Sequence, residues 1–166
     1  GISFMHETVK NLPLDVYTML PSCVPATPFE TSGFDLNSYD LSLLIDKPWV
    51  LGLAEMMNFP GVLNQDNNVM AKLELAKSSG KCIDGHAPYL HGKDLCAYIA
   101  SGVKSDHECT TPDEAIEKLR LGMYVMIREG TAAKDLDALM PVLKTCNTRK
   151  CIFVTDDRHP ADLKEH

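Results

Sequence analysis

The feature that most constrains the fold of this chain is a repeated alternation of short apolar runs with longer segments of helical period. The runs are rich in β-branched and aliphatic residues, and such an alternation is typical of βα units and a parallel sheet. We expect six strands, at residues 16–20, 50–55, 82–85, 103–106, 123–128 and 151–155. The sequence therefore predicts an α/β fold in which six parallel strands form one sheet, with helices between them.

Helix boundary signals support this division. The segment from Thr111 to Glu114 has the form of a capping box, with Pro112 at the first helical position, and the helix it opens is expected to stop at Gly122. Gly80 and Gly102 follow other helical segments and are expected to act as C-terminal caps.

Composition and charge exclude several classes of protein. The 166 residues are 45% hydrophobic and carry a net charge of −7 without any cluster of Lys and Arg, which argues against nucleic acids and anionic membranes as partners. No apolar run approaches the roughly 20 residues of a membrane-spanning helix, and no secretory signal is seen. The six cysteines are scattered without C-x-x-C spacing, so we expect reduced thiols and a cytoplasmic protein.

Polar residues follow five of the six predicted strands. In parallel α/β folds the reactive residues gather at the carboxyl ends of the strands. The residues at these five ends are Glu55, His86, His107 with Glu108, Arg128, and Asp156 with Asp157. A surface turn explains one polar strand end, whereas five in succession indicate a site. The first predicted strand is followed instead by a Pro-rich loop that contains Ser22.

Four of these residues form a candidate metal centre: Glu55, His86, His107 and Asp156. Two imidazoles and two carboxylates suit Zn²⁺, Fe²⁺ or Mn²⁺. A histidine that follows a strand is also commonly a hydrogen-bonded loop residue, so the metal hypothesis depends on the joint placement of the four. The remaining histidines have no strand-end position and are expected on the surface or in loops: His6, His91, His159 and His166.

Several longer motifs are more specific than these single residues. The stretches "PSCVPATPFETSG", "LGLAEMMNFPGVL", "IDGHAP", "SDHECTTPDEA", "MYVMIREGTAA" and "VTDDRHP" occur in this order along nearly the whole chain. They resemble the adenine deaminases of the amidohydrolase superfamily. The resemblance implies a partial (β/α)₈ barrel of the TIM type, in which the six strands would be numbers three to eight.

The resemblance also assigns roles to the strand ends. It implies that Glu55 holds metal in place of the carboxylated lysine of some relatives, that His86 and His107 are ligands, and that Asp156 touches metal and shuttles protons. The metal would be Mn or Fe, with Zn as an alternative, and binuclear in the full-length enzyme.

The implied reaction is the hydrolysis of adenine to hypoxanthine and ammonia, in purine salvage. A divalent metal lowers the pKa of bound water to about 7, which supplies the nucleophile. Asp156 would relay protons, and either Glu55 or Glu108 would protonate the ring nitrogen next to C6. Glu108, Arg128, Ser22 and Asp157 are the candidate substrate-binding residues. Because successive strand residues face opposite ways, Asp157 is expected to act more on its loop than on the chemistry.

One family feature is missing. The first barrel strand of the superfamily supplies a His-x-His pair, and no His-x-His occurs in this sequence. We therefore expect residues 1–166 to be a single partial barrel domain from a longer protein, without the first two strands and the flanking β domain. Little deaminase activity is expected of the segment itself.

Two alternatives stay open. The chain could be a non-catalytic scaffold piece that self-associates through exposed sheet edges into a homo-oligomer. It could also be a related amidohydrolase that acts on a cyclic amide, although many of those enzymes have a carboxylated lysine where this chain has Glu55.

Overall fold

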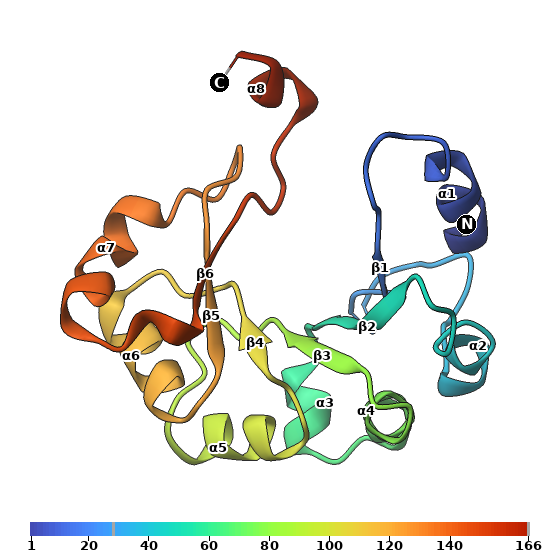
Figure 1. Ribbon diagram of the computed structural model, residues 1–166. Helices are drawn as coiled ribbons and strands as arrows, with labels where there is room; N and C mark the ends of the chain where they lie inside the picture. Colours follow the sequence, from blue (N-terminus) through green and yellow to red (C-terminus); the bar gives the residue numbers. More distant parts are fainter. Residues whose placement is uncertain (28, 166) are drawn as a thin grey trace. The chain divides into compact units, whose positions relative to one another are not determined.

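The computed structural model describes residues 1–27 and 29–165, and the chain divides into two compact units, Gly1–Asp84 and Gly85–His166. Each unit is an α/β assembly around a three-stranded sheet (Figure 1). In the described part of the chain, no helix has both the length and the apolar character that crossing a membrane requires. All six cysteines are free thiols.

The first unit contains a sheet with the order β1-β2-β3, in which β1 pairs in parallel with β2. Its elements are α1 (Ile2–Val9), β1 (Thr18–Leu20), α2 (Ser38–Ser42), β2 (Val50–Met56), α3 (Phe59–Leu63), α4 (Asn67–Ser78) and β3 (Cys82–Gly85), whose last residue already belongs to the second unit. Helix α4 packs against β2 and α2 (Figure 1). It buries Val69, Leu73 and Ala76, which recur at helical spacing and so line one face.

The second unit contains a parallel sheet with the order β4-β5-β6. Its elements are α5 (Gly92–Ala100), β4 (Ser105–Asp106), α6 (Pro112–Arg120), β5 (Tyr124–Arg128), α7 (Leu136–Thr145), a 3₁₀ turn (Thr148–Lys150), β6 (Cys151–Val154) and α8 (Pro160–Glu165). Helices α6 and α7 pack against each other and against β5 (Figure 1). Val125 and Ile127 of β5 point into this core and are at most 1% exposed.

The predicted α/β fold is confirmed, and each of the six predicted strands is present. The expectation of a single sheet was wrong, because the strands pair as two sets of three. The predicted strand at 103–106 is reduced to Ser105 and Asp106, both paired with β5.

The helix boundary signals are also found. Gly80, Gly102 and Gly122 have positive φ angles of 66°, 113° and 91°, as C-terminal caps require. The predicted capping box of α6 is half formed. The Thr111 hydroxyl accepts from the backbone N–H of Glu114 at 3.4 Å, but the Glu114 carboxylate accepts from Thr110 rather than from Thr111.

Candidate metal centre

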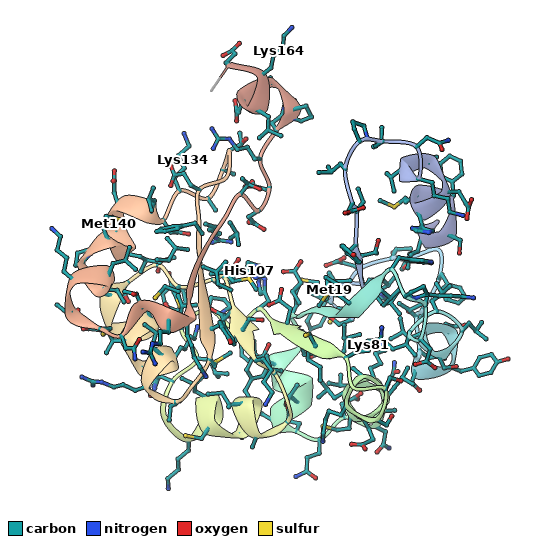
Figure 2. The ribbon with its side chains drawn as sticks, in the orientation of Figure 1. Met19, Lys81, His107, Lys134, Met140 and Lys164 are labelled. Atoms are coloured by element: carbon teal, nitrogen blue, oxygen red, sulfur yellow. The ribbon has the colours of Figure 1, made fainter. Side chains whose placement is uncertain are left out.

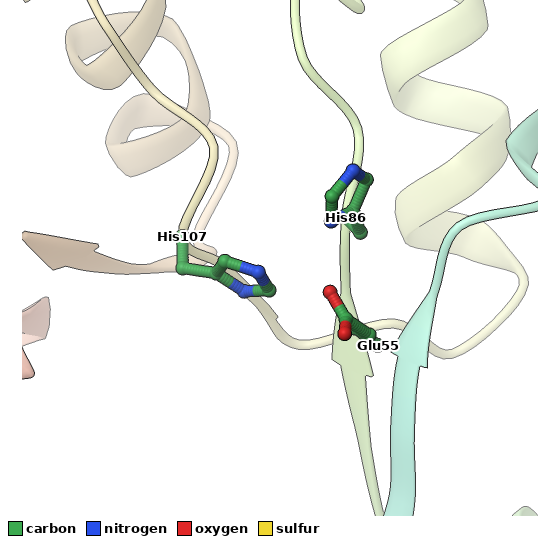
Figure 3. A group of neighbouring side chains, drawn as sticks. All are labelled: Glu55, His86 and His107. Atoms are coloured by element: carbon green, nitrogen blue, oxygen red, sulfur yellow. The ribbon is translucent and has the colours of Figure 1, made fainter. Parts of the chain in front are cut away.

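Two histidines of the second unit each follow a strand. His86 follows β3 directly and His107 follows β4 directly. Their ring centroids are 5.3 Å apart and their planes are inclined by 73° (Figure 3). His107, also labelled in Figure 2, is 8% exposed, while the backbone N–H of His86 donates to the buried hydroxyl of Tyr98 at 3.1 Å. The βα architecture thus places two imidazoles together, as the sequence predicted.

A carboxylate lies between the two rings. Oε1 of Glu108 is 3.6 Å from Nδ1 of His86 and 3.6 Å from Nε2 of His107. These separations are too long for direct hydrogen bonds. The side chain of Glu108 is 14% exposed, so the carboxylate is largely screened from water. Two imidazoles side by side are ligands that suit a divalent transition metal, and Glu108 lies next to both of them.

Arg128, at the end of β5, neutralises this carboxylate. Its Nη2 donates to Glu108 at 3.2 Å, and its Nη1 also binds Glu108. Its Nε donates to Asp135 at 2.8 Å. Burial alone would lower the pKa of Arg128, but hydrogen bonds and charges from Asp135 and Glu108 raise it above its usual range. Arg128 was predicted as a substrate-binding residue. In this structure its charged guanidinium forms ion pairs with the carboxylates of Glu108 and Asp135.

The two aspartates after β6 have different neighbours. Asp156 has a φ of 51°, and its Oδ2 is 3.5 Å from Nη1 of Arg128. Asp157 accepts from the backbone N–H of Ala132 at 3.3 Å, and a Cβ added to Gly130 would overlap with its Oδ1. The side chain of Asp156 thus points toward the guanidinium of Arg128, whereas that of Asp157 packs on the loop that follows β5.

Glu55 and Ser22 belong to the first unit. Glu55 is the penultimate residue of β2, one residue inside the strand end, and is partly buried (Figure 3). The Ser22 hydroxyl donates to the carbonyl oxygen of Glu55 at 2.5 Å. The buried ammonium of Lys72 in turn donates to the carbonyl of Ser22 at 2.9 Å. Ser22 therefore ties the loop after β1 to the end of β2, which is a structural contact beside its predicted role in substrate binding.

Sequence reasoning missed two residues behind the histidines, Asp106 and Lys118, whose side chains are both 0% exposed. The available signals were weak. Asp106 directly precedes His107, and Lys118 lies four residues after Glu114, a spacing that also describes any exposed ion pair on a helix.

Comparison with known proteins identifies the family of the chain. The model of the amidohydrolase family matches residues 1–158, so the chain belongs to that family. The chain is 52% identical over 165 residues to a protein of Desulfatibacillum aliphaticivorans named adenine deaminase, and 55% identical over 163 residues to one of the same name from Clostridium acetobutylicum. These alignments cover 99% and 98% of the chain, respectively. The chain spans about 29% of the length of each of these relatives.

Proposed function

We propose that the protein that carries this chain is a metal-dependent adenine deaminase, which hydrolyses adenine to hypoxanthine and ammonia. The relatives with this name and the family membership support the reaction. One observation in the structure carries the proposal: the imidazoles of His86 and His107 lie together, with ring centroids 5.3 Å apart. Two imidazoles are ligands that fit the metal which the reaction requires.

In this proposal His86, His107, Glu55 and Asp156 hold the metal, which is Mn or Fe, with Zn as the alternative, and binuclear in the full-length protein. Such an ion makes water a nucleophile at neutral pH. The two imidazoles stand together in the second unit, and Glu55 enters the set because of its place at the end of β2 and the likeness to the family.

The carboxylates move the protons. Asp156 accepts a proton from the attacking water and passes it on, and its 32% exposed side chain beside Arg128 leaves room for that exchange. The other proton of the water passes through Glu108 or Glu55 to the ring nitrogen next to C6, and the proton carried by Asp156 goes to the amino group, which leaves as ammonia. Arg128 keeps the Glu108 carboxylate oriented, and Ser22 and Asp157 are weaker candidates for contact with the substrate.

The wider setting follows from this reaction. We place the protein in purine salvage, in the cytoplasm, as a homo-oligomer whose small-molecule substrate is adenine. Residues 1–166 would then form one partial barrel domain of the whole enzyme.

The test is ammonia release from adenine by the protein that carries this chain, prepared without metal and then assayed with and without added Mn²⁺. Two histidine variants are compared, His86→Asn in the site and His91→Asn as the control, because His91 is exposed and its side chain does not cap α5. Release that depends on Mn²⁺ and is lost only in His86→Asn is expected. Ring opening of a hydantoin or dihydropyrimidine without ammonia release from adenine would point to a cyclic amide instead, and turnover of neither to a scaffold.

A further inference from the structure

We propose that Asp106 and Lys118 are positioning residues that fix the separation of the two loops bearing His86 and His107. This inference rests on the proposed function, because the separation matters through the metal that the two imidazoles would share. The pair lies directly behind the histidines in the second unit and does not itself face the reaction.

The ammonium of Lys118 is held in three directions. It is 0% exposed, and its Nζ donates to Asp106 Oδ2 at 2.9 Å, to Glu114 Oε1 at 2.8 Å and to the carbonyl oxygen of Ala87 at 2.9 Å. An ammonium has three donors, so all of its hydrogen-bonding capacity is used. A buried cation with three fixed acceptors is a rigid point in the fold.

Asp106 and Lys118 also form hydrogen bonds with the backbone next to both histidines. Oδ1 of Asp106 accepts from the N–H of Ala87 at 2.7 Å, while Lys118 holds the carbonyl of that residue. Oδ2 of Asp106 accepts from the N–H of Glu108 at 3.1 Å. Ala87 directly follows His86, and Asp106 and Glu108 flank His107. The loops of both histidines are therefore anchored to one ion pair.

Two further side chains of α6 form hydrogen bonds with the backbone of the loop after β3. Glu114 accepts from the backbone N–H of Tyr89 at 2.9 Å, and Glu117, one turn further along α6, accepts from that of Gly92 at 2.8 Å. Two backbone N–H groups of the loop from His86 to α5 thus attach this loop to carboxylates of α6.

A second metal site does not explain the cluster. Ligand atoms of Asp106, Cys109 and Glu114 lie within 4.8 Å of one another, which is a spacing that a metal could bridge. The ammonium of Lys118 already lies within 2.9 Å of both carboxylates. Burial alone would lower the pKa of Lys118, but the charge of Asp106 and the hydrogen bonds to Glu114 and Asp106 raise it, so the cluster already holds a cation.

Metal affinity should therefore depend on Asp106 and Lys118, although neither residue would contact the metal. Partners that orient metal ligands typically change affinity or activity by about 10–100-fold when they are mutated. We expect Asp106→Asn to weaken Mn²⁺ binding to the metal-free protein by about 10–100-fold, measured by titration calorimetry. The variant is nearly isosteric, so its fold, checked by circular dichroism, should persist. Val142→Ala, in α7 and in the core of the same unit, is the control for general destabilisation.

A readout without metal separates this inference from the proposed function. In Asp106→Asn one of the two carboxylate oxygens becomes an NH₂ group, so at least one of the amide protons of Ala87 and Glu108 loses its acceptor and should exchange with solvent about 10-fold faster. The amide of Tyr124, which donates to Lys104 in the sheet, should be unchanged. Lys118→Met gives the same test from the other partner, and if it does not fold, Asp106→Asn alone decides.

The outcomes are distinct. If the wild-type protein neither binds Mn²⁺ nor deaminates adenine, the proposed function fails, and the exchange of Ala87 and Glu108 still tests the anchoring. Unchanged exchange at these two amides in Asp106→Asn would overturn the positioning role. So would a loss of Mn²⁺ affinity in Val142→Ala as large as that in Asp106→Asn, because the effect would then follow stability alone.

Discussion

Arg128 grips Glu108 with both terminal nitrogens of its guanidinium, and Nη2 lies 3.2 Å from Oε2 while Nη1 binds Oε1. A fork of this kind fixes the orientation of a carboxylate as well as its position. The oriented oxygen, Oε1, is the one that lies 3.6 Å from a nitrogen of His86 and from one of His107. A strand-end arginine thus sets the geometry of a carboxylate at the candidate metal centre.

Replacing this arginine by lysine should be costly. Arg128→Lys keeps the charge but loses the fork and the separate Nε bond to Asp135, and we expect the free energy of unfolding to fall by about 1–3 kcal/mol, since hydrogen bonds to charged groups contribute on that scale. Urea unfolding measures it. Arg149→Lys, in the 3₁₀ turn, is the exposed control and should stay within about 0.5 kcal/mol of wild type. Equal stabilities of Arg128→Lys and wild type would show that the fork contributes nothing.

Asp156→Asn tests the proton relay. In the protein that carries this chain, the variant should keep its fold and its KM for adenine while kcat falls by about 10²–10⁴, because an amide cannot accept the proton that a carboxylate accepts. Steady-state kinetics of ammonia release measures both constants. A KM that rises at unchanged kcat would instead assign Asp156 to substrate binding.

Asp157→Asn should affect the loop more than the chemistry. Asp157 holds the backbone N–H of Ala132 at 3.3 Å and closes against Gly130, so its loss is expected to loosen the loop after β5. Limited proteolysis of that loop should accelerate, while kcat falls less than in Asp156→Asn. If both single variants lose kcat equally, the two aspartates work as a unit and the assignment of the shuttle to Asp156 is wrong.

Each apolar run of the sequence forms a strand, although Ile152 and Phe153 of β6 are 40% and 64% exposed. An apolar pattern does not specify which strands pair. Val103 is 0% exposed and was assigned to a strand, yet β4 begins only at Ser105. Val103 is therefore buried although it lies outside the strand. The division into two sheets depends on such details of hydrogen bonding, which periodicity does not carry.

Some residues of the candidate site could be predicted from the sequence, and others could not. His86 and His107 were predictable because each directly follows a predicted strand, the position where reactive residues of parallel α/β folds gather. Lys118 was not, because a lysine on a helix normally faces water, and its burial here depends on acceptors 12 and 31 residues away in the sequence, Asp106 and Ala87. The direction of Asp156 depends on a φ of 51°, where the alternation of a strand no longer holds.

Stability should fall in alkali. Burial raises the pKa of the Cys109 thiol well above its ordinary value of 9.0, and burial also raises that of Cys151. Above pH 9 the unfolded chain releases these protons while the folded chain keeps them, so the folded state binds more protons and the free energy of unfolding decreases as the pH rises. The slope is at most about 1.4 kcal/mol per pH unit for each thiol.

Urea unfolding from pH 7.5 to 10 under reducing conditions measures this slope. Cys109→Ser keeps a donor toward Asp106 but removes the thiol, so its stability should decline less steeply above pH 9. An identical slope in the variant would mean that Cys109 does not cause the loss.

The last prediction concerns the 166-residue chain by itself. The sequence holds two of the proposed imidazole ligands but no His-x-His pair, which the likeness to the family assigns to the metal centre. Fewer ligands should weaken metal binding and distort its geometry, so we expect turnover of adenine far below the roughly 10 s⁻¹ that is typical of enzymes. Ammonia release by the purified chain, with saturating Mn²⁺ and with the longer protein as the positive control, measures this. Turnover near that typical rate by a chain of verified mass would show that the residues present here suffice for catalysis and that the His-x-His pair is dispensable.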